Sequence, residues 1–309
     1  MTLTSDLYNS RSKIDFAPIW KRSLPISLGL VVLGVIITSV FGVNRSIEFE
    51  GGALFSVPVE QSVTVGEVRD VVGVPQARIQ RIENADGSSA MRVQIPTELA
   101  SEFDRVGADL NAVLIPGEQI SRDTVGPTWG SQITQSAVRA LVLFFIVVAI
   151  YLAIRLEPKM ALGALVAVVH DLVLTVTVYS ILRIEVSPAT VIALLTILGY
   201  SLYDTVVVYD KVLENWIEPA NRRKKYSDLM NESMNQVIMR SVNTTITTVL
   251  PVASMLIIGA FLLGGDSLRG FAIALLIGLL LGTYSSIFVA APLLAWIKER
   301  YPDPLPEKI

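Results

Sequence analysis

The stretch PATVIALLTILGYSLYDTVVVY, residues 188–209, decides the class of this protein. It is long and apolar enough to cross the roughly 30 Å of hydrocarbon in a bilayer, which takes about 20 residues of helix. One acidic residue, Asp204, lies within it. A carboxylate near the centre of a spanning helix costs about 2.5–3.5 kcal/mol on insertion scales, so such a residue is a functional candidate. Because low dielectric disfavours a charged carboxyl group, Asp204 is a candidate for binding and releasing a proton inside the membrane.

The composition of the whole chain indicates a polytopic membrane protein. Of its 309 residues, 52% are hydrophobic and 17% are charged, whereas about a quarter of the residues in a soluble domain are charged. The apolar residues are gathered in six runs, each long enough to span a bilayer. The predicted transmembrane helices occupy residues 24–43, 137–154, 160–182, 188–209, 243–263 and 268–297.

Lysine and arginine are concentrated at alternate ends of these predicted helices. The positive-inside rule therefore places residues 1–23 and 298–309 in the cytoplasm, together with a basic loop at 211–240 between helices of the 136–297 region. The first helix is longer than the apolar part of a signal peptide and no clear cleavage site follows it, so we expect a retained anchor. The RRKK cluster is better explained by orientation and lipid contact than by binding of nucleic acid. The basic residues on the predicted cytoplasmic side are Arg11, Lys13, Lys21, Arg22, Arg155, Lys159, Lys211, Arg222, Arg223, Lys224, Lys225, Arg240, Lys298, Arg300 and Lys308.

Residues 44–135 are predicted to form an extracytoplasmic domain. Up to Asp123 this segment contains 13 acidic residues, seven arginines and no lysine. Strand and amphipathic-helix patterns alternate along it in the order β-α-β-β-α-β, which predicts an α+β ferredoxin-like domain. It contains no histidine or cysteine and its acids are scattered, so a binding or structural role is favoured over chemistry. The predicted strands are 53–59, 77–83, 90–96 and 118–126, and the predicted helices are 64–73 and 97–114.

Hydroxyl groups flank Asp204 at helical spacing in the fourth predicted helix. At about 100° per residue, these side chains share one sector of the helix surface. They could orient a carboxyl group that takes up protons. The alternative is a permanently protonated or hydrogen-bonded Asp204 that only stabilises packing. The residues of this face are Thr196, Tyr200, Tyr203, Asp204 and Val207.

A second polar stripe runs along the fifth predicted helix. Its members are spaced at i, i+3, i+4, i+7, i+8 and i+11, and so lie on one side of a helix. Arg240 is near the cytoplasmic end, where a long cationic side chain can reach the interface. Arg240 could therefore simply extend to the interface. Alternatively, it could reach toward Asp204 and hold the deprotonated form of that carboxyl group. The pattern leaves both interpretations open. The stripe consists of Arg240, Asn243, Thr244, Thr247, Thr248 and Pro251.

His170 and Asp171 are neighbours in the third predicted helix. His170 is the only histidine of the chain and could relay protons. Adjacent residues diverge by about 100° around a helix, so we do not expect both to face one partner. Asp171 shares its face with small and polar residues and is predicted to join a buried polar network, while the role of His170 stays open. One histidine, no cysteine and separated acids are too few ligands for a metal site, and we expect no cofactor.

Small residues recur at every fourth position of the sixth predicted helix. This spacing lets helix backbones approach closely, either inside the bundle or against another subunit. Packing within the bundle is the favoured interpretation. The ladder is Ala274, Gly278, Gly282, Ser286 and Ala290.

Several motifs resemble those of the SecF family, the smaller subunits of the SecD–SecF protein-export apparatus. The resemblance covers essentially the whole chain and preserves the order of the motifs. One departure is at Glu48-Phe49-Glu50-Gly51-Gly52, where the family usually has Asp-Phe-x-Gly-Gly, so Glu48 retains the carboxylate one methylene longer and a structural role in the turn is expected. The matching motifs are LGYSLYDTVVVYDK at 198–211, Arg240-Ser-Val-Asn-Thr-Thr, His170-Asp171, Val125-Gly126-Pro127 and Gly51-Gly52.

This resemblance implies half of a resistance-nodulation-division type of transporter, completed by a partner. It implies a bacterial plasma-membrane protein that pairs with SecD and associates with a SecYEG-type channel. Such proteins use the proton gradient to help draw preproteins outward and are not enzymes. Asp204 and Arg240 match the family positions implicated in proton coupling, and protonation of Asp204 would weaken its attraction for Arg240.

Three other functions compete with this interpretation. A half-transporter of the same superfamily could export small molecules or lipids, although the external domain of 44–135 is small for that task. An intramembrane aspartyl protease would use Asp171 and Asp204 as a pair sharing one proton. Its usual GxGD motif is missing, because the chain reads Leu202-Tyr203-Asp204. A passive assembly scaffold, in which Asp204 and Arg240 only pack, is the third alternative.

Overall fold

The structure is a computed structural model that describes residues 14–83, 87–218, 221, 224–262 and 266–302. The basic residues Arg11, Lys13, Arg222, Arg223 and Lys308, and the hairpin turn at 84–86, lie outside the described residues. Within these ranges, six helical segments are long and apolar enough to cross a membrane, which confirms the predicted number. They are α2 (Ala17–Phe41), α6 (Pro127–Arg155), α7 (Pro158–Leu182), α8 (Pro188–Ile217), α9 (Tyr226–Ser254) continued by the π-helix η4 (Met255–Leu262), and α10 (Asp266–Ser285) continued by the π-helix η5 (Ser286–Ala290) and α11 (Ala291–Arg300).

Several helices extend beyond the apolar runs that predict them. Most of the predicted basic loop at 211–240 is helical, because α8 continues to Ile217 and α9 already begins at Tyr226. Local sequence explains where α8 starts. Ser187 and Thr190 form a capping box there, and Pro188 occupies the first turn, where its missing N–H costs nothing. Polar residues therefore continue these helices past the membrane without interrupting them.

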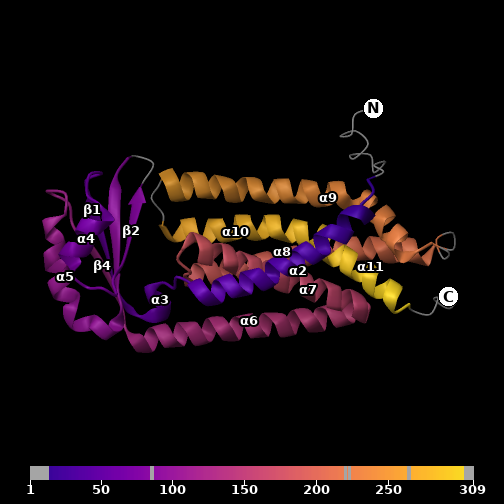
Figure 1. Cartoon of the computed structure of the whole chain (residues 1–309), viewed down its shortest axis with the longest axis horizontal. Helices are drawn as coiled ribbons and strands as arrows, with labels where there is room; N and C mark the ends of the chain where they lie inside the picture. The colour runs from indigo at the N-terminus through magenta and orange to yellow at the C-terminus, as the bar shows by residue number, and fades with distance from the viewer. Residues whose placement is uncertain (1–13, 84–86, 219–220, 222–223, 263–265, 303–309) are drawn as a thin grey trace.

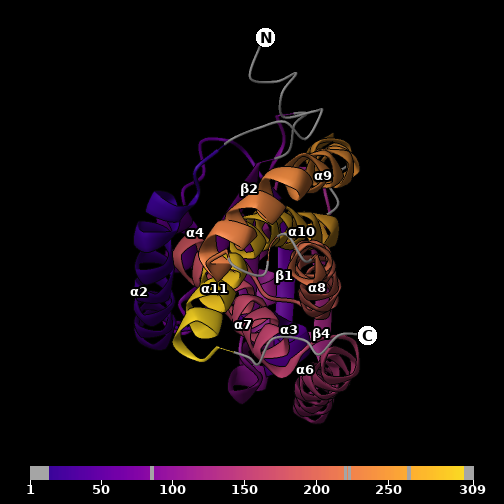
Figure 2. The ribbon, with the colours of Figure 1, turned by 90° about the vertical axis from the view of Figure 1, so that its right-hand side faces the viewer.

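The spans differ in how deeply they are packed. Half of the most apolar stretch of α7 and of α8 is buried, against 11% in α2 and in α6 and 6% in α9. In cross-section, α2 and α8 lie on opposite sides with α7 and α10 between them (Figure 2). Helix α6 runs along one long edge of the bundle and α9 along the opposite edge (Figure 1). The core is therefore built from α7, α8 and α10, whereas the outer helices keep apolar surface for lipid or partner helices.

A four-stranded antiparallel sheet lies at one end of the bundle (Figure 1). Its order in the described residues is β2-β3-β1-β4, and a helix follows β1 and another precedes β4, as predicted. Assignment to the ferredoxin-like class stays a prediction. Alternate residues of β1, including Phe55 and Val57, are buried against the domain's helices. The elements are β1 (Gly52–Val59), α4 (Val65–Val72), β2 (Arg78–Glu83), β3 (Ser89–Ile95), η1 (Thr97–Glu102), α5 (Phe103–Asp109), η2 (Leu110–Ala112) and β4 (Ser121–Val125).

The second helix predicted for this domain, 97–114, is broken into short pieces. A 3₁₀ turn, η1, precedes α5, and Leu99 inside it has non-helical dihedral angles. The apolar face still serves the core, because Phe103, Val106 and Leu110 are buried and Leu99 packs against them. The periodicity therefore predicts the buried face correctly, but it does not predict that the α-helix changes to 3₁₀ turns at both ends.

The Gly-Gly turn joins the membrane bundle to the sheet. A short helix, α3 (Ile47–Glu50), precedes it. Gly51 and Gly52 have positive φ angles of 75° and 128°, which side-chain-bearing residues rarely adopt. A Cβ atom on Gly52 would lie 2.2 Å from the carbonyl oxygen of Ile95. Glycine is therefore required at this position both by dihedral angle and by space.

Backbone contacts tie this turn region to the loop between α7 and α8. The amide of Val186 donates to the Asn44 carbonyl at 2.7 Å, and the amide of Ser46 donates to the Val186 carbonyl at 3.0 Å. Arg92 on β3 forms an ion pair of 2.9 Å with Glu185. These contacts hold the sheet against the outer ends of α7 and α8.

Candidate functional site

Asp204 lies in the middle of α8 and faces α9. Its side chain is 5% exposed. The Oδ1 atom accepts a hydrogen bond of 2.7 Å from the hydroxyl of Ser241 on α9. The Oδ2 atom is buried and has no hydrogen-bond partner among the described residues. The carboxyl group is thus held by one oxygen, and the second oxygen is available to a proton.

Arg240 contacts a tyrosine and not the carboxylate. Its Nη2 atom donates to the Tyr203 hydroxyl at 2.8 Å, and its guanidinium lies 5.9 Å from the centre of the Tyr203 ring. No ion pair joins Arg240 to Asp204 in the described part of the chain. Two consecutive pairs therefore connect α8 to α9, one between Tyr203 and Arg240 and one between Asp204 and Ser241. A cation one residue away from the hydrogen-bond donor of Asp204 can respond to the charge of that carboxyl group.

Asp171 is the centre of a buried polar network, as predicted. Its Oδ2 atom accepts hydrogen bonds from Ser201 on α8 at 2.5 Å and from Ser285 on α10 at 2.7 Å. Its Oδ1 atom lies 2.9 Å from Nδ1 of His170. Both Asp171 and His170 are 2% exposed. Asp171 therefore joins three helices through both of its oxygens.

His170 contacts Asp171 directly, although the two residues are neighbours on one helix. Its ring stacks against Tyr284 at a centroid distance of 6.1 Å. The hydroxyl of Tyr284 is 2.7 Å from that of Ser27 on α2. The Nε2 atom of His170 is buried without a hydrogen-bond partner among the described residues. The network thus extends from α8 and α10 through α7 toward α2.

Two consecutive serines at the end of α10 connect the surroundings of both acids. Ser285 donates to Asp171, while the Ser286 hydroxyl lies 2.8 Å from that of Thr205, the residue after Asp204. The helix changes here from α-helix to the π-helix η5, and such local widening is frequent at functional sites. Serines of α8, α9 and α10 are the part of the site that the sequence analysis missed, except that Ser286 was assigned to the small-residue ladder. A hydroxyl inside an apolar span, beside an acid or in a helix facing one, is the signal that could have found them.

The predicted supporting hydroxyls divide into two groups. Thr248 on α9 donates to the Tyr200 hydroxyl of α8 at 3.3 Å. Thr244 and Thr247 donate to carbonyl groups of their own helix and do not reach α8 through their hydroxyls. Much of the predicted stripe is exposed, including Arg240, Asn243 and Thr247. Polar side chains exposed on a spanning helix are costly in lipid, so this face of α9 requires water or a partner.

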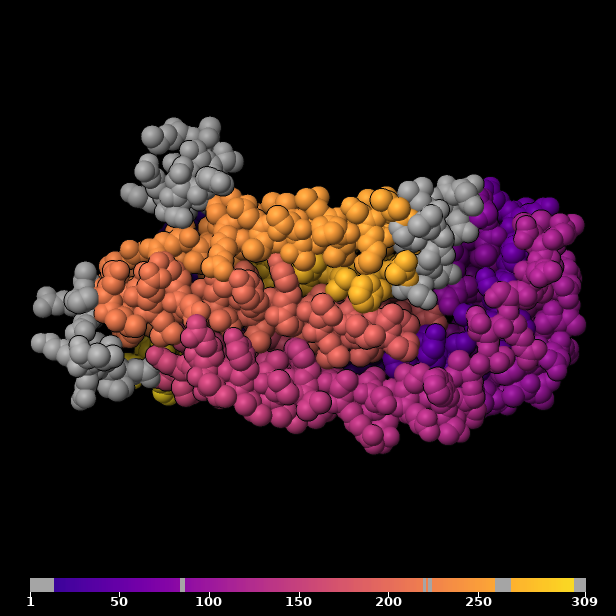
Figure 3. Space-filling model, turned by 180° about the vertical axis from the view of Figure 1, so that it is seen from behind, coloured from indigo at the N-terminus to yellow at the C-terminus, as the bar shows by residue number. Residues whose placement is uncertain are grey.

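A groove lies beside this stripe. It has a volume of about 520 Å³ and is lined by α6, α8 and α9, including Tyr151, Tyr203 and Arg240. Tyr203 is 53% exposed there. Seen from behind, α8 lies between α6 and α9 on this face of the molecule (Figure 3). The groove surface on which Tyr203 of α8 is exposed therefore also carries Arg240.

The residues of the Gly-Gly motif are placed as a structural joint. Gly51 and Gly52 form the turn described above, and Gly126 caps α6 with Pro127 in its first turn. Glu48 is half-buried, and no hydrogen bond or ion pair involves it within the described ranges. Glu50 instead pairs with Arg45 at 3.1 Å and with Arg78 of β2 at 3.0 Å. The charged contact of this motif thus belongs to Glu50, which the sequence analysis did not single out.

The described residues do not form a metal site or an aspartyl-protease dyad. Among the described residues, no three or more His, Asp or Glu side chains gather as metal ligands would. Asp171 and Asp204 make no hydrogen bond to each other, because each is engaged by different serines. The geometry of a carboxyl dyad that shares one proton is therefore not present in this part of the chain.

The sequence and fold are similar to those of protein-export proteins. Residues 107–300 match the family model described as protein export membrane protein SecD/SecF, C-terminal. The protein translocase subunit SecF of Streptomyces coelicolor is 39% identical over 307 residues, a match that covers 98% of this chain and 81% of the relative. The same-named subunit of Mycobacterium tuberculosis (strain ATCC 25618 / H37Rv) is 38% identical over 303 residues, with 92% and 67% covered.

A solved structure extends the similarity to three dimensions. The crystal structure of SecDF from Thermus thermophilus, named there as a translocon-associated membrane protein, matches with a TM-score of 0.80 and 31% identity. The match covers 94% of this chain and 39% of that chain. A second SecDF structure, in the super-membrane-facing form, matches with a TM-score of 0.66. This chain thus corresponds to about two-fifths of SecDF.

Proposed function

Because the chain belongs to the SecF family of protein-export membrane proteins, we propose that it couples proton movement at Asp204 to Sec-dependent export. The protein is a multi-pass protein of the bacterial plasma membrane, an accessory subunit of Sec protein translocation and not an enzyme. The observation that supports proton coupling is the carboxyl group of Asp204, which is buried where α8 meets α9. Its Oδ1 atom accepts a hydrogen bond, whereas its Oδ2 atom has no partner among the described residues. Asp171, His170 and the serines around them extend the polar path through the core.

The cycle follows from the contacts around Asp204. When the carboxyl group is charged, it attracts the guanidinium of Arg240, which is held in the resting arrangement by Tyr203. When a proton from the outside binds to Oδ2, that attraction disappears and Arg240 returns to Tyr203. The change alters how α8 packs against α9, and the α7–α8 loop carries it to the external domain through Val186 and Glu185.

The energy of the gradient is sufficient for such a switch. One elementary charge crossing 100 mV gains about 2.3 kcal/mol. That amount shifts a two-state equilibrium by a few tens of fold, since 1.4 kcal/mol corresponds to about a factor of ten. No covalent step is needed, because binding and release of a proton at one carboxyl group suffice to change the packing.

We further propose that SecD packs against the open face of α8 and α9. Tyr203, Arg240 and Asn243 are exposed on this face, and lipid would leave such polar groups without partners. A SecYEG-type channel, the translocating preprotein and the surrounding lipid are the other proposed partners. The positive-inside rule supports cytoplasmic termini and an extracytoplasmic position for residues 44–135.

The direct test is export of a secreted preprotein into membrane vesicles that also contain SecD and the channel. Asp204→Asn keeps the size and most of the hydrogen bonding of the side chain but cannot take up a proton. We expect loss of the gradient-dependent part of export, with normal assembly of the complex. Asp210→Asn is the matched control, because Asp210 lies on the same helix and pairs with Arg155 at 3.3 Å near the interface. Export by Asp204→Asn at the wild-type rate would make Asp204 a packing residue and the chain a passive scaffold.

A further inference from the structure

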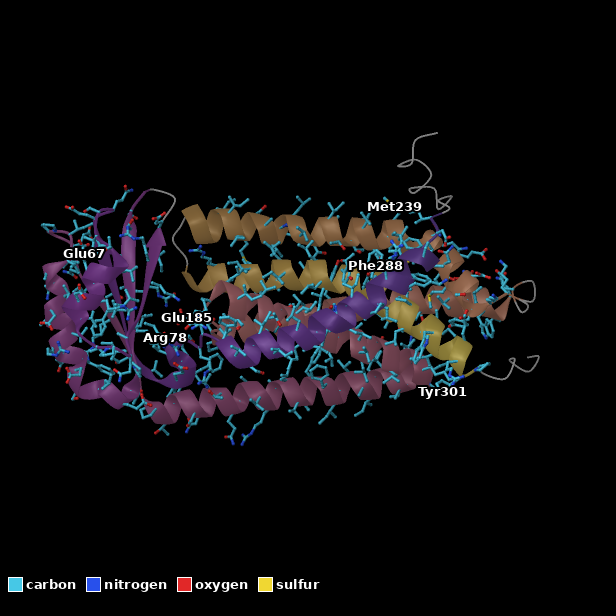
Figure 4. The ribbon with its side chains drawn as sticks, in the orientation of Figure 1. Glu67, Arg78, Glu185, Met239, Phe288 and Tyr301 are labelled. Carbon is cyan, nitrogen blue, oxygen red and sulfur yellow. The ribbon has the colours of Figure 1, made fainter. Side chains whose placement is uncertain are left out.

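A second cleft lies outside the membrane core, where the sheet meets the outer ends of the helices. Its volume is about 650 Å³. One wall is β2, and the opposite wall is the loop between α7 and α8 together with the start of α10. Figure 4 labels Arg78 of β2 and Glu185 of that loop at the junction between the sheet and the helices. Neither Asp171 nor Asp204 lines this cleft.

The cleft runs along the free edge of the sheet. Four consecutive residues, 79–82, line it, although successive side chains of a strand point to opposite faces. The lining therefore includes the edge of β2, and Arg92 of β3, opposite Gln80, extends it over one face of the sheet. In the order β2-β3-β1-β4, β2 is an edge strand, and among the described residues its backbone pairs with β3 alone. Its outer N–H and C=O groups therefore face the cleft.

The surroundings of this edge suit a polypeptide in an extended conformation. An edge strand is a template for a further strand, which binds through main-chain hydrogen bonds and needs no particular sequence. Partly exposed apolar side chains, including Val65, Ile82 and Ile273, can receive alternate side chains of the added strand. The charged lining has four arginines and two glutamates, so acidic and neutral segments are favoured over basic ones. The charged residues are Arg81, Arg92, Arg183, Arg269, Glu48 and Glu185.

A lipid headgroup fits these observations less well than a peptide. Arg92 is paired with Glu185, Arg183 donates to the Phe41 carbonyl at 2.7 Å, and Arg81 donates to the Gln61 carbonyl at 3.2 Å. These arginines keep their positive charge but already bond to protein oxygens, so a headgroup would have to displace those partners, whereas the backbone edge of β2 is open. The outer N–H and C=O groups of β2 are the groups with which an added strand would pair.

We propose that this cleft binds an extended segment of the exported polypeptide, which pairs with β2 as a fifth strand of the sheet. The proposal rests on the export role of the chain and is independent of proton coupling at Asp204. Arg92 and Glu185 connect this site to the loop between α7 and α8. A bound segment is thereby placed next to the loop that joins the helix of Asp171 to the helix of Asp204.

Cysteine cross-linking tests the proposal, because the chain has no cysteine of its own. Gln80→Cys places the only thiol on the cleft edge, and Thr124→Cys places it on β4, the other edge of the same sheet. Each variant is assembled with SecD and the channel in vesicles, and a preprotein with one cysteine in its emerging segment is arrested during export. Export is driven without a proton gradient, so the result does not depend on Asp204. We expect a disulfide cross-link at Gln80→Cys several-fold stronger than at Thr124→Cys, whereas equal or absent cross-linking at both positions overturns the proposal.

A peptide titration on the wild-type full chain in nanodiscs covers the case in which Gln80→Cys does not assemble. The probe is a fluorescent peptide of alternating valine and glutamate, with methyl groups on the amide nitrogens of either the odd or the even residues. Strand pairing uses every second N–H group, so one methylation pattern should abolish binding and the other should preserve it. Equal binding of both peptides would exclude strand pairing. Displacement of the unmodified peptide by anionic lipid in the nanodisc would identify a headgroup site and overturn the proposal as well.

Discussion

Asp171 and Asp204 lie on neighbouring helices of the same core and are almost equally buried, but they are held very differently. Asp171 accepts hydrogen bonds from Ser201 and Ser285 through one oxygen and contacts His170 through the other. Asp204 accepts one hydrogen bond, from Ser241, and its second oxygen has no partner among the described residues. Burial alone therefore does not distinguish these two acids.

The number of hydrogen-bond donors around each carboxyl group makes the distinction. A buried carboxylate with several donors is fixed in place, and its removal leaves those donors without acceptors. A carboxyl group with one donor has less to lose when its charge changes. Asp171 is accordingly interpreted as the acid that organises α7, α8 and α10, and Asp204 as the acid that responds to protons.

The largest expected effect on stability follows from Asp171→Ala. Ser201 would lose its buried acceptor and Ser285 one of its two, and leaving a buried polar group unsatisfied costs about 1–3 kcal/mol, more where the group is charged. Thermal unfolding of the detergent-solubilised complex should show a strongly reduced midpoint. The control is Asp210→Ala, because Asp210 forms only a half-exposed ion pair, worth about 0–1 kcal/mol. If Asp204→Ala destabilised the protein as much as Asp171→Ala, the contrast between the two acids would be wrong.

The substitution Gly282→Ala leaves both acids in place and should disturb only the surroundings of Asp171. A Cβ atom on Gly282 would lie 2.8 Å from Cβ of Ser201, so Gly282→Ala pushes Ser201 away from Asp171. Overpacking of this kind costs about 1–3 kcal/mol. Gly29→Ala is the control, because nothing lies within 4 Å of the added atom. We expect a lower unfolding midpoint for Gly282→Ala alone, with gradient-dependent export reduced no more than the amount of assembled complex. A selective loss of gradient dependence would show that Asp171 takes part in coupling.

The smallest expected effect concerns the single donor of Asp204. Ser241→Ala removes one hydrogen bond, which contributes about 0.5–1.5 kcal/mol, or somewhat more because the acceptor can be charged. The unfolding midpoint should fall slightly, while gradient-dependent export changes although Asp204 is intact. Ser254→Ala serves as the control on the same helix, because the Ser254 hydroxyl donates only to its own helix at 2.9 Å. Identical export by Ser241→Ala and the wild type would mean that this contact does not position the carboxyl group.

The sequence analysis located both acids but assigned their surroundings only in part. It predicted that tyrosines and threonines on the same face would surround Asp204, whereas the donor is Ser241 of the next helix. It left open whether Arg240 reaches Asp204, and in this structure Arg240 reaches Tyr203. It expected that His170 and Asp171 would not both face one partner, and Asp171 indeed bonds to Ser201 and Ser285 while His170 stacks on Tyr284, but it did not predict their contact with each other. The partners of Asp204 and Arg240 depend on the rotation of one helix against another, which spacing within a helix does not contain, whereas the contact of His170 with Asp171 depends on the side-chain conformations of two neighbours on α7.

The membrane spans, the strands of the sheet and the acids within the spans were determined by the sequence itself, because hydropathy, alternation and charge act over a few neighbouring residues. The positive φ angles of Gly51 and Gly52 belong to a local turn, whereas the close approach of Gly52 to the Ile95 carbonyl comes from the packing of the sheet. The tertiary structure decided which oxygen of each acid is occupied, that Glu50 and not Glu48 carries the ion pairs, and that the edge of β2 faces a cleft. Those features join residues far apart in the chain, and they exist only once helices and strands have packed at a definite angle and register.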